Sequence, residues 1–252
     1  MKYIVFSFDD GRKDFFTNAV PILLKYGFRA SAHVVTGFID GSVPADSELL
    51  AKRGFLSIDE CNQLKNNGFD ISSHSNSHCN DFDDISLSFE KLKKWGIADE
   101  NNHIGYSSPR SNLDSDLLNK LNYGLKCEYI RTGTRVKQRN MFSIFVYLIA
   151  NYLKSKKSFV LFNRKYLIND ISKLPELLPS VAIKNTTTPE SIIYFLKNMD
   201  DENLVIFNFH SIVKSDVSDK WDFLETDFDR ICSFIKDNKE FKVLTLKELK
   251  LL

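Results

Sequence analysis

Short apolar runs alternate along this chain with stretches that have the amphipathic pattern of helices. Residues 3–8 are rich in β-branched and aromatic types and stop at Asp9-Asp10, which is the pattern of a buried strand that ends in a loop. A helix is predicted over residues 17–26 and a second strand over residues 30–35. This order of elements predicts the beginning of a parallel βαβ unit.

The alternation continues to the end of the sequence. Further helices are predicted at residues 57–67, 85–95, 115–121, 189–199 and 228–236, and further strands at residues 69–72, 104–107, 127–130, 204–209 and 242–244. Continuous apolar strands that alternate with helices indicate a parallel sheet covered on both faces, either closed as a barrel or open and doubly wound. With 252 residues, 43% of them hydrophobic, and no linker-like tract, the chain is predicted to form a single domain of residues 1–252.

The middle of the chain, at about residues 135–185, does not follow this rhythm and is predicted to be a partly helical insert. Its most apolar stretch, residues 141–153, has thirteen residues, whereas a membrane-spanning helix needs about twenty. We therefore predict a buried helix at this place and no transmembrane segment.

Charge and cysteine content exclude several classes of function. The 34 basic and 33 acidic residues give a formal net charge of +1, so no nucleic-acid partner is expected. The four cysteines are widely spaced and form no CxxC pair, which argues against a cysteine-based zinc site or a disulfide framework. The chain begins with Met1-Lys2 and passes directly into a strand without the pattern of a signal peptide, so a cytoplasmic location is predicted.

Polar residues gather at the carboxyl ends of the predicted strands, the catalytic face of parallel barrels. They are Asp9, Asp10, His74, Pro109 and His210. The four-residue spacing between His74 and His78 lets both imidazoles face one ion. One carboxylate and two neutral histidines would leave a divalent ion with an open position for water, while the second aspartate could act as a base and His210 as an acid.

Three motifs carry a resemblance to a known family. They are Ser7-Phe8-Asp9-Asp10-Gly11, His74-Ser75-Asn76-Ser77-His78 and Phe209-His210, and in order and spacing they resemble the polysaccharide deacetylase family of NodB type, carbohydrate esterase family 4. The resemblance implies a distorted (β/α) barrel of about seven parallel strands. It also implies that Asp9 is the catalytic base, that His210 is the acid, and that the metal ligands are Asp10, His74 and His78.

The third motif of that family departs from the usual pattern here. An arginine that holds the base usually stands two residues before a proline, but Ser107 occupies this position, and Arg110 follows Pro109. Ser108, Pro109 and Arg110 are therefore predicted to bind substrate or support the site. Arg110 is the nearest candidate to hold Asp9, with Arg131 and Arg12 as alternatives. The Asp-Trp pair of the fourth motif is not found.

The resulting prediction is a hydrolase that uses one divalent ion, zinc before other first-row metals, to remove an N- or O-acetyl group from a carbohydrate. A cytoplasmic location would favour an intermediate of glycan biosynthesis as the substrate. One alternative is hydrolysis of another amide, such as a formamide or a cyclic imide. Another is a degenerate carbohydrate-binding protein, and a third is a non-haem iron oxygenase, for which an adjacent free aspartate is less suitable. Trp221 and Phe223 either stack on a sugar ring or pack in the core.

Overall fold

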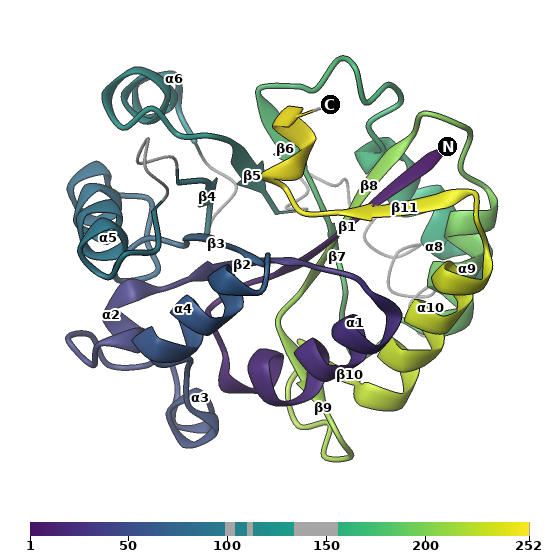
Figure 1. The fold of residues 1–252 in the computed structure, drawn as a ribbon, viewed down its shortest axis with the longest axis horizontal. Helices are drawn as coiled ribbons and strands as arrows, with labels where there is room; N and C mark the ends of the chain where they lie inside the picture. The colour runs from purple at the N-terminus through teal and green to yellow at the C-terminus, as the bar shows by residue number, and fades with distance from the viewer. Residues whose placement is uncertain (99–103, 110–112, 134–155, 252) are drawn as a thin grey trace, which may run out of the picture.

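The computed structural model describes residues 1–98, 104–109, 113–133 and 156–251 (Figure 1). Its strands are β1 (Lys2–Phe8), β2 (Ser31–Val34), β3 (Asp70–Ser73), β4 (Tyr106–Ser107), β5 (Ile130–Thr132), β6 (Leu177–Pro179), β7 (Val181–Ala182), β8 (Leu204–Phe209), β9 (Ser211–Val213), β10 (Asp222–Leu224) and β11 (Phe241–Leu244). Its α-helices are α1 (Val20–Tyr26), α2 (Thr36–Ile39), α3 (Glu48–Arg53), α4 (Ile58–Asn66), α5 (Phe82–Lys94), α6 (Ser115–Asn119), α8 (Lys156–Asn163), α9 (Pro189–Lys197) and α10 (Glu225–Asp237).

The main sheet is a ring of parallel strands. Its order is β6-β5-β4-β3-β2-β1-β8-β7, and β11 adds to β1. Because only Ser180 separates β6 from β7, these two short strands form one segment that pairs with β5 on one side and with β8 on the other. Within the described residues the ring has seven parallel members: β1, β2, β3, β4, β5, the β6–β7 segment and β8. The predicted distorted (β/α) barrel is thus confirmed.

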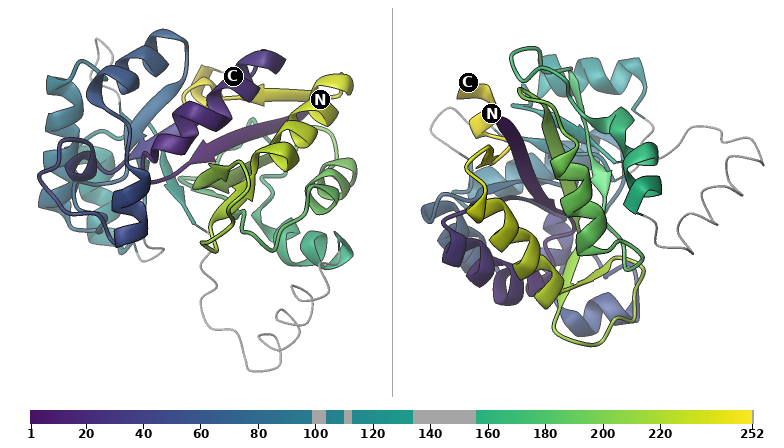
Figure 2. Two further views of the ribbon diagram at one scale, coloured as in Figure 1. Left: turned by 90° about the horizontal axis from the view of Figure 1, so that it is seen from below. Right: turned by 90° about the vertical axis from the view of Figure 1, so that its right-hand side faces the viewer.

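The helices cover the outside of this ring. Figures 1 and 2 show them around the strands, and α1, α10 and α9 contact one another in that order. The predicted helix start at Ser57 is present as a capping box, in which Ser57 and Glu60 each accept from the other's backbone N–H. The predicted helix at residues 17–26 is divided into a π-helical turn, η1 (Phe15–Ala19), and α1, which begins with Val20-Pro21.

Residues 134–155, which include the predicted helix at residues 141–153, lie outside the described residues. The rest of the predicted insert forms α8, a short 3-10 turn η3 (Arg164–Tyr166), β6 and β7. The end of this segment therefore supplies the strand that completes the ring. None of the helices that the structure describes combines the length and the apolar character that a bilayer crossing requires.

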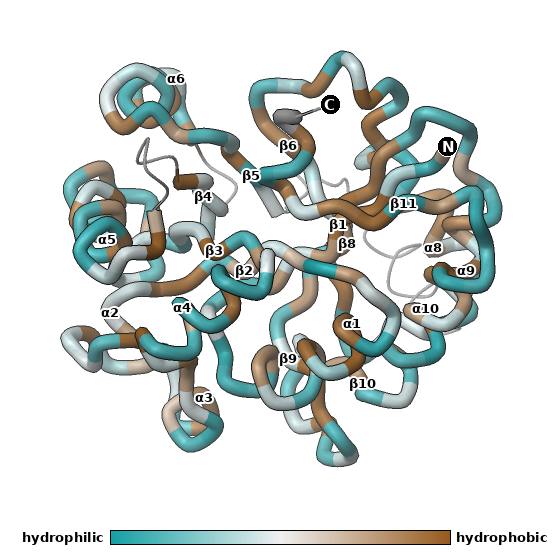
Figure 3. Tube along the Cα trace, in the orientation of Figure 1, coloured by the Kyte–Doolittle hydropathy of each residue, from teal (hydrophilic) through white to brown (hydrophobic). Residues whose placement is uncertain are grey.

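Alternation along the strands gives the barrel two different surfaces. Phe6 and Phe8 of β1 and Phe209 of β8 face outward and pack in one cluster with Phe15 of η1 and Phe228 of α10. In Figure 3 hydrophobic segments gather along the central strands. One part of the interior is apolar, with Val5, Leu178, Leu204, Ile206 and Leu244 in a second cluster. Further toward the carboxyl ends, strands β1, β2, β4, β5 and β8 bury the polar side chains of Ser7, His33, Ser107, Arg131 and Asn208.

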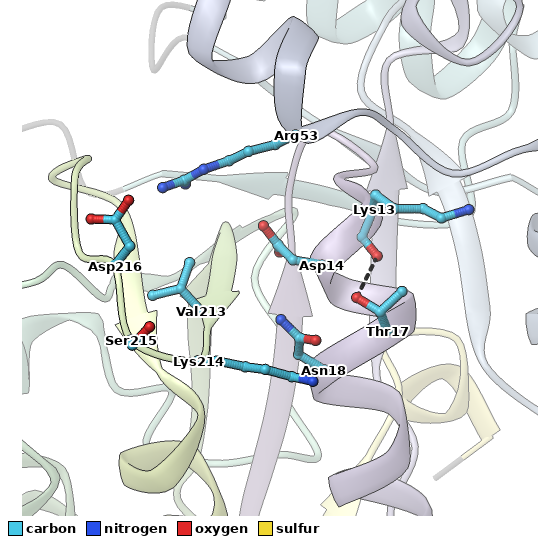
Figure 4. A pocket seen from close by; sticks show the side chains of 9 residues that line it. All are labelled: Lys13, Asp14, Thr17, Asn18, Arg53, Val213, Lys214, Ser215 and Asp216. Atoms are coloured by element: carbon cyan, nitrogen blue, oxygen red, sulfur yellow. Dashed lines mark hydrogen bonds between the residues drawn. The ribbon is translucent and has the colours of Figure 1, made fainter.

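Asp14 joins the segment after β1 to β9. Its Oδ1 accepts a hydrogen bond of 3.1 Å from the backbone N–H of Ile212. Burial raises the pKa of Asp14 from 3.8 to about 6, although the Ser211 hydroxyl and this N–H act in the opposite direction. The carboxylate faces a cavity of about 340 Å³ that is also lined by Lys13, Thr17, Asn18, Arg53, Val213, Lys214, Ser215 and Asp216 (Figure 4).

We expect Asp14→Asn to stabilise the protein at pH 8 and to have much less effect at pH 4. Because the folded-state pKa lies above the unfolded value, the native protein loses stability as the pH rises through this range and the buried carboxyl ionises. Asparagine can still accept from Ile212 but cannot ionise. Thermal unfolding with a chelator present should show the variant melting higher by a few degrees at pH 8. An equal shift of both midpoints at both pH values would contradict the assignment.

Candidate metal centre

Three potential metal ligands meet at the carboxyl end of the barrel. Asp10 lies two residues after β1, His74 directly follows β3, and His78 lies in the loop between β3 and α5. One ligand atom from each lies within 4.8 Å of the other two. Asp10 and His74 are buried, whereas the His78 side chain is 28% exposed, so the centre opens to solvent on the side of His78.

The bare oxygen of Asp10 shows that this group fits a cation. Oδ1 is buried and has no hydrogen-bond partner among the described residues. It lies 3.6 Å from His74 Nε2 and 3.5 Å from His78 Nε2. A buried carboxylate oxygen without a partner is costly, and a divalent ion shared with the two imidazole nitrogens would remove that cost.

Hydrogen bonds to the other nitrogen of each imidazole orient both rings. His74 Nδ1 lies 2.8 Å from the backbone oxygen of Ser107, and His78 Nδ1 lies 2.6 Å from Asp46 Oδ2. Both partners are acceptors, so Nδ1 carries the hydrogen and Nε2 keeps its lone pair for an ion. Burial also lowers the pKa of His74 to about 3, which keeps this ring neutral at pH 7.

The backbone of the centre has an unusual conformation. Asp10, Ser75 and His78 have positive φ angles of 72°, 68° and 60°, a region that non-glycine residues seldom adopt. Asp84, in the first turn of α5, stabilises the histidine loop by accepting from the backbone N–H groups of Asn76 and Ser77, at 2.9 Å each. Strain of this kind persists only where surrounding contacts enforce it, and it is frequent at functional sites.

Asp9 is held beside the metal group by several donors. Arg131 and Asn208 donate to its two oxygens, the latter at 2.8 Å, and the Ser107 hydroxyl lies at 3.4 Å. Burial alone would raise the pKa of Asp9, but the charge of Arg131 opposes it and the pKa lies well below 3.8. Asp9 is therefore an ionised carboxylate in a fixed orientation.

Of the three arginines considered for Asp9, Arg131 makes the contact. It is fully buried on β5, where it pairs in register with Ser107 of β4. The guanidinium thus comes from the strand next to the one that bears the third motif. Arg12 binds Asp10 instead, and Arg110 lies outside the described residues.

His210 approaches Asp9 from the end of β8. Its Nε2 lies 4.0 Å from Asp9 Oδ2, and its ring stacks on Trp221 with a centroid distance of 4.3 Å and an interplanar angle of 21°. Burial lowers the pKa of His210 to about 4. Of the two aromatic residues considered for sugar stacking, Phe223 is buried in the core, whereas Trp221 belongs to the site through His210.

The two described residues of the third motif lie close to this group. Ser108 is buried and donates a hydrogen bond of 3.1 Å to Asn80 Oδ1, and Pro109 is half-buried beside it. Their role in substrate binding stays a prediction.

Sequence reasoning missed three supporting residues. Asp46 orients His78, Asn208 donates to Asp9, and His33 lies 3.5 Å from Asp9. Asn208 had a usable signal, because it stands two positions before His210 and therefore faces the same side of its strand.

The fold and the site together define a class of protein. It is the parallel α/β barrel that carries, at the carboxyl ends of its strands, a carboxylate and two imidazoles that could hold a metal ion. Within that class, residues 1–103 match the polysaccharide deacetylase family, so the resemblance predicted from the motifs is confirmed. The match covers the metal group and ends before β4. No curated protein matches the chain in sequence.

Solved structures extend the likeness to the whole fold. A family 4 acetyl xylan esterase from Clostridium thermocellum, in complex with a cobalt ion, is 15% identical with a TM-score of 0.54, and the alignment covers 99% of this chain and 90% of that one. The peptidoglycan deacetylase PdaC from Bacillus subtilis is 12% identical with a TM-score of 0.53 and the same coverage. The Xyl-CE4 domain of a multidomain xylanase from the hindgut metagenome of Trinervitermes trinervoides is 13% identical with a TM-score of 0.52, and the alignment covers 98% of this chain and 89% of that one.

We expect His78→Ala and His74→Ala each to lose a bound divalent ion. Each substitution removes one of the three ligand atoms that face one another. Metal content measured after dialysis against zinc should fall from about one ion per chain to near zero. Asp9→Asn, which leaves the three ligands in place, is the matched control and should retain the ion. Full occupancy in both histidine variants would rule out this site.

Proposed function

We propose that the protein is a metal-dependent hydrolase that removes acetyl groups from a carbohydrate. The observation that supports this most directly is the pairing of two unlike carboxylates. Asp10 presents a bare oxygen to two imidazoles, while Asp9 is ionised, hydrogen-bonded and adjacent. Hydrolysis by an activated water requires one carboxylate that binds the metal ion and a second that accepts a proton from the water.

Asp10, His74 and His78 would hold the ion, and zinc suits one carboxylate and two imidazoles. When bound, a divalent ion would polarise an acyl carbonyl and lower the pKa of water at the site. Asp9 supplies a fixed acceptor for the proton that the attacking water gives up. Arg131 and Asn208 hold the carboxylate in position, so little reorganisation is needed when the proton arrives.

His210 is placed to supply the proton to the leaving group. Its Nε2 lies 4.0 Å from the Asp9 oxygen, within reach of the same substrate atoms. The water oxygen forms a bond to the acetyl carbon, the bond from this carbon to the sugar nitrogen or oxygen breaks, and the departing atom takes a proton through His210. Because burial lowers the pKa of His210 to about 4, the imidazole is neutral at pH 7, and the proton that it gives up is replaced by the one that Asp9 takes from the water. The stack on Trp221 restrains the ring for this step.

The contact between Arg131 and Asp9 bears on the alternatives. A degenerate carbohydrate-binding protein was considered because the third-motif arginine is missing, but a guanidinium is present at the base from another strand. Acetate release from N- and O-acetylated sugars, compared with hydrolysis of formamides and cyclic imides, tests the substrate class. Oxygen consumption with iron tests the oxygenase alternative. The cytoplasmic location, and with it a biosynthetic substrate, stays a prediction.

We expect Asp9→Asn to lower kcat by about a hundredfold or more while metal content stays unchanged, because loss of a positioned base costs roughly two to four powers of ten. His210→Ala should behave similarly. Acetate release and metal content are measured on the same preparations. If Asp9→Asn loses the ion and Asp10→Asn keeps it, the roles of the two aspartates are reversed.

Arg131→Gln tests whether the guanidinium on β5 positions the base. We expect kcat to fall by about a hundredfold with little change in metal content, because a base displaced by about 1 Å can lose that much rate. Arg164→Gln, at an exposed arginine whose nearest carboxylate is 3.6 Å away, is the matched control and should remain fully active. Wild-type kcat in the Arg131 variant would show that Asp9 is positioned without it.

A further inference from the structure

Arg12 lies between the proposed metal centre and the loop that connects β9 to β10. Its side chain is 3% exposed. Nε and Nη2 donate to Asp10 Oδ2 at 2.9 and 2.8 Å, and Nη1 donates to Ser211 Oγ at 2.8 Å. Nη1 also lies 3.6 Å from Asp219 Oδ2. One guanidinium therefore contacts a predicted metal ligand and two residues that are about two hundred positions further along the chain.

On the metal side, Arg12 occupies one oxygen of Asp10. Oδ2 receives both donors, whereas Oδ1 has no partner and faces the two histidines. Two donors of the guanidinium fork converge on this one oxygen and hold it in place, whereas a lysine ammonium is a single point charge without this paired geometry. Arg12 therefore holds Oδ2 of Asp10, and this contact directs Oδ1 of the same carboxylate toward the two imidazoles.

On the loop side, Arg12 contacts the residues around the His210–Trp221 stack. Ser211 directly follows His210, and Asp219 stands two positions before Trp221. Asp219 Oδ1 accepts from the backbone N–H of Trp221 at 3.4 Å, and the Asp219 N–H donates to Asp222 Oδ2 at 2.8 Å. The position of Trp221, and with it the ring of His210, is therefore connected to Arg12.

We propose that Arg12 is a positioning residue that couples ion binding at Asp10 to the placement of the Trp221 loop. This inference rests on the proposed metal centre but does not depend on which substrate is hydrolysed. Because the guanidinium is buried between two carboxylates, a shift of Asp10 on binding an ion is transmitted to Asp219. His210 and Trp221 are then aligned for proton donation only when an ion is bound at Asp10.

Whether substitution of Arg12 weakens or tightens metal binding distinguishes this positioning role from a simple charge effect. By Coulomb's law, removing a cation next to a metal site should tighten metal binding. Removing a residue that orients a metal ligand should weaken it, typically by about 10- to 100-fold. Arg12→Gln, which removes the charge and the fork together, therefore gives opposite results under the two explanations.

Arg53, the last residue of α3, offers a matched control because it contacts the same loop. It donates to both oxygens of Asp222, at 2.5 and 2.9 Å, and to Ser218 Oγ at 2.8 Å. No contact joins it to Asp10 within the part of the chain that the structure describes. Asp219→Asn provides a second comparison, because it weakens only the loop arm of Arg12.

The experiment measures zinc affinity by chelator competition and Trp221 fluorescence in a Trp95→Phe background, which leaves Trp221 as the single tryptophan of the chain. We expect Arg12→Gln to lose about tenfold or more in affinity and to lose the fluorescence response to zinc. Arg53→Gln should alter the fluorescence of the zinc-free protein but keep its affinity within about threefold. Asp219→Asn should keep its affinity and lose the response.

Arg12→Lys provides the test if Arg12→Gln does not fold, as judged by circular dichroism. It keeps the charge without the fork and should also bind zinc more weakly. Unchanged or tighter binding in the folded Arg12 variants, or an unaltered fluorescence response, would overturn the inference while leaving the metal centre intact. A wild-type protein that binds no zinc would overturn both, and failure of every acetylated substrate alone would overturn only the proposed activity.

Discussion

The pairing of each buried carboxylate with a buried guanidinium is the interaction on which the site depends. Two adjacent carboxylates at the end of a parallel strand are costly to bury without opposite charge. Arg131 stabilises the ionised form of Asp9 and Arg12 that of Asp10, so both remain charged in a nearly dry environment. The pairing also makes them unlike, since Asp9 is hydrogen-bonded through both oxygens whereas Asp10 keeps one bare.

The polar interior of the barrel makes this pairing possible. The polar residues that are buried near the carboxyl ends of the strands carry hydroxyl, amide, imidazole and guanidinium groups, and many of these groups hydrogen-bond to one another or to Asp9. Arg131 donates to Ser180 at 2.8 Å, and Ser180 donates to the backbone oxygen of Thr132 at 2.9 Å. Asp9 is therefore held by a connected set of contacts across several strands, and the three proposed metal ligands are oriented by separate contacts from Arg12, Ser107 and Asp46.

The sequence was most informative where a signal is local. Strong strand runs, the capping box at Ser57 and the motifs around Asp10 and His74 could be interpreted residue by residue, and the confirmed barrel followed from their order. The strand that closes the ring could not be predicted, because it is short, contains Pro179 and is interrupted at Ser180. Asp46 and His33 contact residues that are distant in the sequence, and no motif or spacing along the chain predicts such contacts. Arg131 could be named as a candidate for Asp9, but only the register of β4 and β5 selects it.

The interrupted β6–β7 segment, with Ser180 between its two strands, is the seam where the barrel closes between β5 and β8. β6 and β7 have three and two residues, so the ring is closed there by fewer backbone hydrogen bonds than join β1 to β8. Local opening starts where such bonds are fewest. Ser180 lies in this seam and supports Arg131, whereas Asp10, His74 and His78 follow β1 and β3, neither of which pairs with β6 or β7. Local opening of the seam would thus loosen the guanidinium that holds Asp9 while the contacts around Asp10, His74 and His78 remain, which gives the two parts of the proposed site different local stabilities within one domain.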